Sequence, residues 1–426
     1  MNSLHKVRHI LLTLFAGSTV AFAQTSERFT LEQLQQLSRE NYPALKQKEN
    51  YEAIGKNRVQ QTGTNYLPQI TITGQGTLQS EVTEFDIPIQ GFGGFKPSAD
   101  QYAAGIEIRE NLLDYGAVHT QKEIERANAG AQMSQADADL LKLKERINQL
   151  YASICLQKEN KNILQLRLEE LNAKKEKLRS AVTNGSALQS SFLVLESEYY
   201  ISQQKLDEVN SLLMAACKSL SVFSGKNIDS ASVVTELPAV SLSAQSAVAR
   251  PEFKMFEQQA QALQLKAKMI TKNNLPRLYV FGRGYYGRPG FNFLNDDFRP
   301  YGLIGAGINW NLSAYYTSGK EKSNLRLNSG IIDAQRKTFD LNLQSTIIQE
   351  QEEINRLEKM IEADKKITEA KTTIRKAASS QLDNGTITPS DYLTELNAES
   401  QAQLNMKLHE IQLMMAKINL NTTLGF

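Results

Sequence analysis

Few side chains of this 426-residue chain have the types and the spacing that catalysis or metal binding requires. The chain has four histidines and two cysteines, and only His119 and His409 lie beyond residue 23, far apart in helical sequence. No nucleophile is paired with a base, and there is no phosphate-binding loop or cluster of metal ligands. We therefore predict that the protein is not an enzyme and that it binds no metal and no cofactor.

The two cysteines are candidates for a disulfide rather than for catalysis. Cys155 lies 30 residues before Gly185 and Cys217 lies 32 residues after it, which places them at similar heights on paired antiparallel helices. Helix axes about 8–10 Å apart often hold the Cα atoms too far apart for a disulfide. The pattern leaves a disulfide and two free thiols as alternatives.

Charged side chains alternate with isoleucines in one strand-like segment. Glu107 and Arg109 alternate with Ile106 and Ile108, and successive side chains of a strand point to opposite faces. If the isoleucines face lipid, the charges line a pore; the alternative is a surface pair close to a loop. Because charge on a lipid-facing surface is costly, we favour the pore interpretation and take Glu107 and Arg109 as candidate lumen residues.

Residues 1–23 have the pattern of an export signal. A basic start, an apolar stretch too short to span a bilayer and the tripeptide Ala21-Phe22-Ala23 follow one another, which predicts cleavage after residue 23. No cysteine follows that position, so we expect no N-terminal lipid anchor. The destination is then the periplasm or the outer membrane.

The overall charge is nearly balanced, with 48 Lys plus Arg against 46 Asp plus Glu. This balance gives no support for a nucleic-acid partner. The hydrophobic fraction is 41% and the mean hydropathy is −0.39. No stretch approaches the roughly 18 apolar residues of a transmembrane helix, which excludes a helical membrane protein.

The chain contains an internal twofold repeat. Pro43 recurs as Pro251 at an offset of 208 residues, and the Asn-Gly pair that ends at Gly185 recurs at Gly385 at an offset of 200. One shortening in a single loop reconciles the two offsets. We predict a first repeat over residues 24–225, a linker over 226–247 lying against the outside of the helical part, and a second repeat over 248–426.

Each repeat combines a glycine-rich window with long helical segments. Residues 66–116 and 275–319 hold 15 of the 24 glycines, and period-two alternation there predicts strands. Elsewhere apolar residues such as Ile147 and Ile154 follow the 3-4 spacing of a coiled coil. The predicted order in each repeat is a helix, a β-hairpin (66–116 and 275–317) and a long helical hairpin (117–225 and 318–426).

Each long helical hairpin turns at its Asn-Gly pair. Gly185 and Gly385 supply the left-handed backbone that ends a helix. Restart signals follow, because Ser186 begins a capping-box pattern and Thr388 precedes a proline and Asp391. These motifs predict two well-defined helix turns.

The number of strands decides the architecture. Two hairpins supply four strands, whereas the smallest filled barrels have about eight. In lipid, an open sheet edge leaves backbone groups unpaired at several kcal/mol each. Three copies of four strands make 12, which lies within the range of outer-membrane barrels. The predicted fold is therefore mainly α with a small β part: coiled-coil hairpins form a periplasmic α-barrel below a trimeric 12-stranded transmembrane β-barrel.

Taken together, these features resemble the TolC-type outer-membrane efflux proteins, or outer membrane factors. The features are the A-x-A signal, Leu-Pro-x-hydrophobic junctions at residues 67–70 and 275–278, the twofold repeat, and the Asn-Gly turn followed by Asp391. The resemblance covers nearly the whole chain after the signal. It implies a homotrimer in outer-membrane lipid with a large periplasmic portion. The trimer would be the exit duct of a tripartite efflux or type I secretion system, working with an inner-membrane pump and a periplasmic adaptor (membrane fusion) protein.

The resemblance also implies roles for the helix turns. Gly185 with Ser186 and Gly385 with Thr386 match the tips where adaptor hairpins dock in that family. Asp391 matches an aspartate of the periplasmic gate, where the channel is closed. The gate is therefore expected at the helix tips.

The chain departs from the family pattern at two positions near the gate. Thr394 stands where the family can show a second acid, and Ser191 occupies the position of an acid in the first repeat. A weaker ring of negative charge is expected. Asp391 has an alternative role as a helix cap, because an acid near a helix N-terminus is stabilising by itself.

Two other functions compete with the duct. A periplasmic coiled-coil adaptor would have one long helical hairpin rather than two. A structural coiled coil without a transmembrane barrel would not need the windows at 66–116 and 275–319. The duct is therefore the favoured function.

Overall fold

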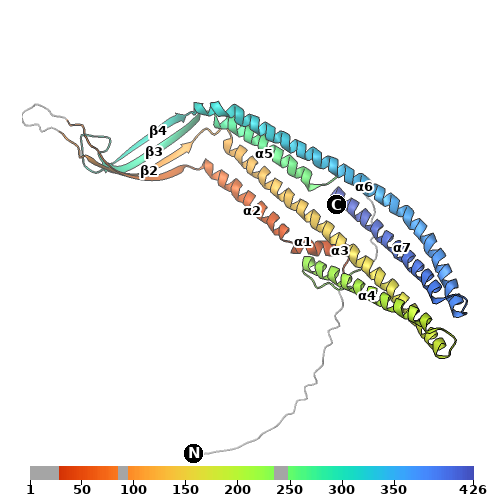
Figure 1. Cartoon of the computed structure of the whole chain (residues 1–426). Coiled ribbons are helices and arrows are strands. Elements are labelled where there is room, and N and C mark those ends of the chain that lie inside the picture. Colours follow the sequence, from red (N-terminus) through yellow and green to blue (C-terminus); the bar gives the residue numbers. More distant parts are fainter. Residues whose placement is uncertain (1–27, 85–94, 235–247) are drawn as a thin grey trace, which may run out of the picture.

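The computed structural model describes residues 28–84, 95–234 and 248–426. The molecule is long and narrow, with a small β-sheet at one end and the turns of two helical hairpins at the other (Figure 1). The predicted signal (1–23) and residues 235–247 of the predicted linker lie outside the described residues. Within the described ranges, no helix has both the length and the apolar character of a membrane span.

The described part is mainly helical with one small sheet, as predicted. Short 3-10 turns at Thr64–Tyr66 and Leu312–Ala314 precede β1 and α6. A helix, two strands and two long helices follow one another twice, and the division into repeats at 225 and 248 stays a prediction. The elements are α1 (Leu31–Asn41), α2 (Pro43–Gly63), β1 (Gln69–Leu78), β2 (Asp100–Asn111), α3 (Ala117–Thr183), α4 (Gln189–Ser224), α5 (Pro251–Asn273), β3 (Arg277–Arg288), β4 (Arg299–Asn309), α6 (Tyr315–Asp383) and α7 (Pro389–Leu424).

The four strands form one antiparallel sheet in chain order, β1-β2-β3-β4. β2 pairs with β3, with Glu107 opposite Arg283, so the two predicted hairpins are joined into a single sheet. β1 and β4 are the edge strands, and within the described part of the chain each pairs on one side only. The sheet therefore ends in two open edges.

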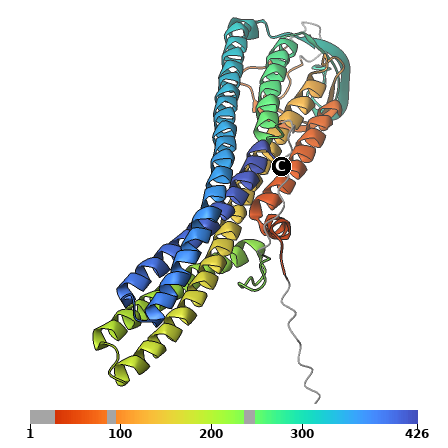
Figure 2. The same ribbon diagram turned by 90° about the vertical axis from the view of Figure 1, so that its right-hand side faces the viewer.

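The helices form a curved layer. α3 and α6 are the longest, with 67 and 69 residues. α3 contacts α2, α4, α5 and α7, whereas α6 contacts α5 and α7. α2 and α4 lie roughly end to end, as do α5 and α7 (Figures 1 and 2). The order across the layer is α2/α4, α3, α5/α7, α6, which leaves α6 at one edge and α2 with α4 at the other.

The main apolar core lies midway along the helical part, where α1 meets α3 and α4. Ile147 and Ile154, from the predicted coiled-coil seam of α3, are completely buried and pack with Leu220 of α4 and with α7. Phe29 adds the start of the described chain to this core through a parallel β-bridge to Val233. The residues after α4 are thereby held against the helices.

Cys155 and Cys217 both lie in this core, and both are free thiols. The disulfide alternative is therefore wrong. Burial raises the pKa of the Cys155 thiol to about 11 and also raises the pKa of the Cys217 thiol. Because the thiolate is the reactive form, the two cysteines act as small apolar core residues.

Candidate functional site at the helix tips and on the strand face

The predicted site residues lie at opposite ends of the molecule. The α3–α4 and α6–α7 turns lie side by side at one end, where a small core joins the two hairpins (Figures 1 and 2). Glu107 and Arg109 lie on β2 at the other end. The sequence candidates therefore form two separate sites, which we call the helix tips (residues 180–191 and 380–391) and the strand face (the sheet face that carries Glu107).

The two turns have the same backbone geometry. Gly185 and Gly385 adopt left-handed φ angles of 74° and 70°. The Ser186 amide donates to the Ala181 carbonyl at 2.9 Å, and the Thr386 amide donates to the carbonyl of residue 381 at 2.9 Å. These are the bonds of a Schellman motif, which satisfies the last carbonyls of a helix. A Cβ at either glycine would meet nothing within 4 Å, so the backbone angle alone requires glycine.

The helices that restart after the turns are capped differently. At α7, Thr388 is the N-cap, and its hydroxyl accepts from the Asp391 amide at 3.2 Å while Asp391 Oδ2 accepts from the Thr388 amide at 3.0 Å. This capping box agrees with the sequence signal. At α4, the predicted box beginning at Ser186 is wrong: the N-cap is Leu188, which has no side-chain bond. The Ser186 hydroxyl instead donates to the Ala181 carbonyl at 3.0 Å, at the end of α3.

Asp391 therefore has a structural role within one chain. Its carboxylate is exposed and accepts bonds from the Thr388 hydroxyl and amide, which lower the pKa of Asp391. The carboxylate stays charged at neutral pH. It can thus cap α7 and contribute negative charge at the tip at the same time.

A small cavity of about 100 Å³ lies between the two tips. Its apolar lining comes from Leu178 of α3, Leu195 of α4 and Leu382 of α6. Asp383 closes one side, where it binds the Nζ atoms of Lys174 and Lys177 at 2.8 and 3.0 Å. The bond from Lys174, followed by the one from Lys177, lowers the pKa of Asp383. The two hairpins are thus joined by an ion pair at the rim of an apolar recess.

Further from the tips, a partly buried polar network joins the same hairpins. Arg375 of α6 contacts Glu399 of α7 at 2.7 Å and Glu170 of α3 at 3.1 Å. The hydroxyl of the completely buried Tyr392 donates to Glu170 at 2.6 Å. Burial, and then Glu170, raise the pKa of Tyr392, so the phenol stays protonated. The sequence analysis missed this network, whose hydrogen-bonded partners lie up to 222 residues apart.

The strand face carries the two predicted charged residues together with a third. Glu107 Oε2 accepts from Arg283 Nε at 3.0 Å across the β2–β3 pair. The Arg109 guanidinium lies 3.7 Å from the centre of the Tyr279 ring. Ile106 and Ile108 are exposed on the opposite face. Arg283 was not assigned a side from the sequence, because only the pairing of β2 with β3 places it beside Glu107.

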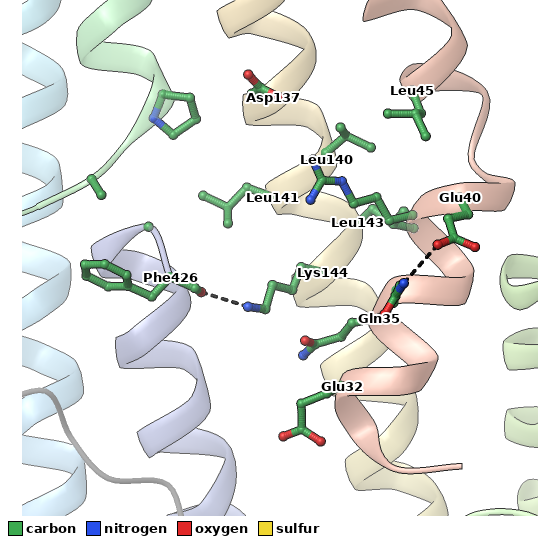
Figure 3. Close-up of a pocket in the computed structure, with 15 residues that line it drawn as sticks. Glu32, Gln35, Glu40, Leu45, Asp137, Leu140, Leu141, Leu143, Lys144 and Phe426 are labelled. Carbon is green, nitrogen blue, oxygen red and sulfur yellow. Dashed lines mark hydrogen bonds between the residues drawn. The ribbon is translucent and has the colours of Figure 1, made fainter.

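A second hollow lies midway along the molecule, between α1, α3 and the end of the chain, with a volume of about 830 Å³ (Figure 3). There Lys144 Nζ donates to the Phe426 carbonyl at 2.9 Å, and Gln36 donates to Glu40 at 3.0 Å. None of the predicted site residues lines this hollow. Among the described residues, no group of three or more His, Cys, Asp or Glu side chains is placed to hold a metal ion.

A family model described as outer membrane efflux protein matches residues 34–226. Over these residues the chain resembles the outer membrane efflux proteins. No curated protein matches it in sequence.

Solved outer-membrane channels have the same fold as this chain. VceC of Vibrio cholerae matches with a TM-score of 0.73 at 15% identity, over 93% of this chain and 96% of that chain. CmeC of Campylobacter jejuni matches at 0.70 and 12%, over 93% and 85%. MtrE of Neisseria gonorrhoeae, in its open state, matches at 0.69 and 15%, over 93% and 88%. At these identities the likeness establishes the fold.

The match to this family, together with the shared fold, confirms several predictions. The protein is a duct of the outer membrane with a large helical portion in the periplasm, and it is a conduit rather than an enzyme. The duct is favoured over the coiled-coil adaptor and over the structural protein without a barrel. The individual roles predicted for seven residues stay predictions: Glu107, Arg109, Gly185, Ser186, Gly385, Thr386 and Asp391.

Proposed function

We propose that three copies of this chain assemble into the exit duct of a tripartite efflux or type I secretion system. The observation that carries the proposal is the pair of open edges, β1 and β4, on the four-stranded sheet that the described residues form. A sheet in lipid must close, because each unpaired backbone group costs several kcal/mol there. Three copies supply 12 strands, within the range of outer-membrane barrels.

The two faces of the sheet support this assignment. Ile72, Ile106 and Ile304 are exposed on one face, and we assign that face to outer-membrane lipid. Glu107 and Arg283 share the other face, which we assign to the lumen. A charged lipid face would be costly and a charged lumen is not.

The helical layer supports the same assembly. Its two edges, α6 on one side and α2 with α4 on the other, expose large apolar side chains to solvent. Leu327 and Leu341 are exposed on α6, and Tyr200 and Leu212 are exposed on α4. Exposed apolar side chains on helix faces without a neighbour favour an interaction site there. We propose that α6 of one copy packs against α2 and α4 of the next, which closes a periplasmic tube.

At the periplasmic end, we assign adaptor docking to the tips that carry Gly185, Ser186, Gly385 and Thr386. The apolar cavity between the tips offers a recess for an apolar side chain of an adaptor hairpin. Asp391 would lie at the gate of the closed tube, where its capping bonds keep it charged. An inner-membrane pump supplies the cargo in this assignment.

Assembly can be tested with a matched pair of variants. The protein is expected in the outer-membrane fraction. After extraction with detergent it should have the mass of a trimer by light scattering. Leu341→Glu on the edge helix α6 should reduce the trimer fraction, while Leu166→Glu on the central helix α3 should not. The two leucines have nearly equal exposures of 68% and 67%. A soluble periplasmic monomer would contradict the proposal.

Docking can be tested with a photo-crosslinker at Ser186 or Thr386 in cells that produce the pump and the adaptor. Both positions are expected to capture the adaptor. Ser211, an exposed serine in the middle of α4, is the control and should not. Equal capture at Ser211 would count against docking at the tips.

A further inference from the structure

The strand face has an excess of positive charge. β-Strand alternation and the uninterrupted register assign its members, because paired residues share a face. All other side chains of the four strands on this face are uncharged. The charged members are one glutamate and four arginines: Glu107, Arg109, Arg277, Arg283 and Arg299.

Two of these arginines are paired with acids. Arg283 binds Glu107 at 3.0 Å, and Arg299 lies 3.7 Å from Asp297 in the loop before β4. Arg109 and Arg277 form no ion pair with any residue that the structure describes. Each chain therefore presents two uncompensated guanidinium groups on this face.

Both unpaired arginines lie at the end of the sheet nearest to the helices. Arg277 is the first residue of β3, and Arg109 pairs with Gln69, the first residue of β1. The acids close to Arg109 in the sequence do not pair with it. Glu110 follows Arg109 and so points to the opposite face, and the Asp114 carboxylate accepts from two backbone amides at the start of α3.

Arg109 stacks on the Tyr279 ring, which in turn lies on the backbone of β4. Its guanidinium lies 3.7 Å from the centre of the Tyr279 ring. That ring lies over Gly307 of β4, where a Cβ would come within 2.6 Å of the ring. A guanidinium stacked on an aromatic ring keeps its edge free to donate two parallel hydrogen bonds to a carboxylate or phosphate. Arg277 is also fixed, because it donates to the Asn273 side chain at 3.0 Å.

We propose that Arg109 and Arg277 form an anion-binding ring inside the duct, which takes cargo bearing a carboxylate or phosphate group. This inference rests on the proposed trimer, in which three copies of the pair surround one lumen. The ring lies where the sheet joins the helices. It is opposite in sign to Asp391 at the helix tips, so the duct has a cationic and an anionic section.

The test uses purified trimers in a planar lipid bilayer, with inorganic tripolyphosphate added on the side of the strands. The wild-type current should be blocked. In the double variant R109Q/R277Q, the concentration for half block should rise at least about tenfold, because hydrogen bonds to charged groups contribute about 1.5–3 kcal/mol each. R277Q alone, at an exposed position, should give a smaller increase.

Arg288→Gln is the matched control, since Arg288 is on the same strand but on the opposite face. Its block should equal that of the wild type. Glu107→Gln should strengthen the block, because it frees Arg283. Conducting pores with an unaltered block in R109Q/R277Q would overturn the anion-binding ring alone. If no protein formed a conducting pore, the proposed duct would be wrong, and the ring with it.

Discussion

The two long helical hairpins have nearly the same turns and very different surroundings. α3 buries 18 of its 67 residues, whereas α6 buries six of its 69. α3 lies in the middle of the layer and α6 at its edge. The difference in burial therefore reflects the number of neighbouring helices that one copy provides for each. Within the first hairpin, α3 completes its packing inside the chain, whereas α6 of the second hairpin has a face that another copy covers in the proposed trimer. Equal turn geometry therefore does not imply equal roles.

The largest change in stability is expected from the polar network around Arg375, which holds the second hairpin to the first. Arg375→Met should lower the free energy of unfolding by about 3 kcal/mol, because it leaves Glu399, only 4% exposed, without its cation. Arg356→Met, which breaks an exposed pair with Glu353 on the same helix, should cost at most about 1 kcal/mol. Urea unfolding followed by circular dichroism measures both. Equal losses would show that the hairpins are not held by this network.

The turn glycines test whether the two tips are equivalent. Gly185→Ala and Gly385→Ala should each cost about 1–2 kcal/mol, because alanine is strained at the left-handed φ angle. The two losses should agree, since neither site has a neighbour within 4 Å. Gly330→Ala in the middle of α6 is the control and should be neutral or stabilising by up to about 1 kcal/mol. A loss at only one tip would mean that the turns differ in the assembled protein.

The two tips differ in their helix caps. Changing a cap should alter the free energy of unfolding by less than changing a turn glycine. Thr388→Ala removes the N-cap of α7 and should cost about 1 kcal/mol. The double change L188T/S191D introduces the same capping box at α4 and should stabilise it by a similar amount. Thr373→Ala, within α6, is the control for a lost hydroxyl away from a helix end. No gain from L188T/S191D would show that the first turn cannot accept the box.

Acid should loosen the second tip before the first. The pKa of Asp383 is lowered in the folded protein, so its contribution to stability is present above the ordinary value of 3.8 and is lost as the pH falls through the lower folded-state value. The first hairpin has Thr183 at the corresponding position. Amide protection factors at residues 380–390 should therefore fall more below pH 3.8 than those at 180–190. Asp383→Asn should reduce the difference, and Asp391, whose pKa is also lowered, accounts for what remains.

The local parts of this structure could be predicted from the sequence. The absence of proline and the 3-4 spacing predict α3 with the observed ends, because both are properties of neighbouring residues. Glycine after asparagine predicts both tips for the same reason. The predicted cap at Ser186 was wrong because its hydroxyl has two possible partners, and the end of α3 takes it. Spacing alone does not rank two such bonds.

The non-local parts of the site could not be predicted in this way. Glu107 and Arg109 were placed on one face by alternation, but the arginine that pairs with Glu107 lies 176 residues further along the chain. Likewise, Arg375 and Glu170 are 205 residues apart. Such pairs depend on which strands and helices become neighbours, and no local pattern in a single sequence encodes that. The fold shared with the solved channels supplies the arrangement that local chemistry leaves open.

The length of α6 has an electrical consequence. A helix of 69 residues extends about 100 Å, and this one runs from the sheet to the helix tip without a break. Salt screens charges over about 10 Å at 0.1 M, so Arg109 and Asp391 do not influence each other through solution. For an ion that crosses the duct, the two charged sections act as two resistances in series. The larger of the two dominates the measured conductance. The charge of the outer end is therefore measurable only by a probe applied from that side, or after the helix tips have been opened.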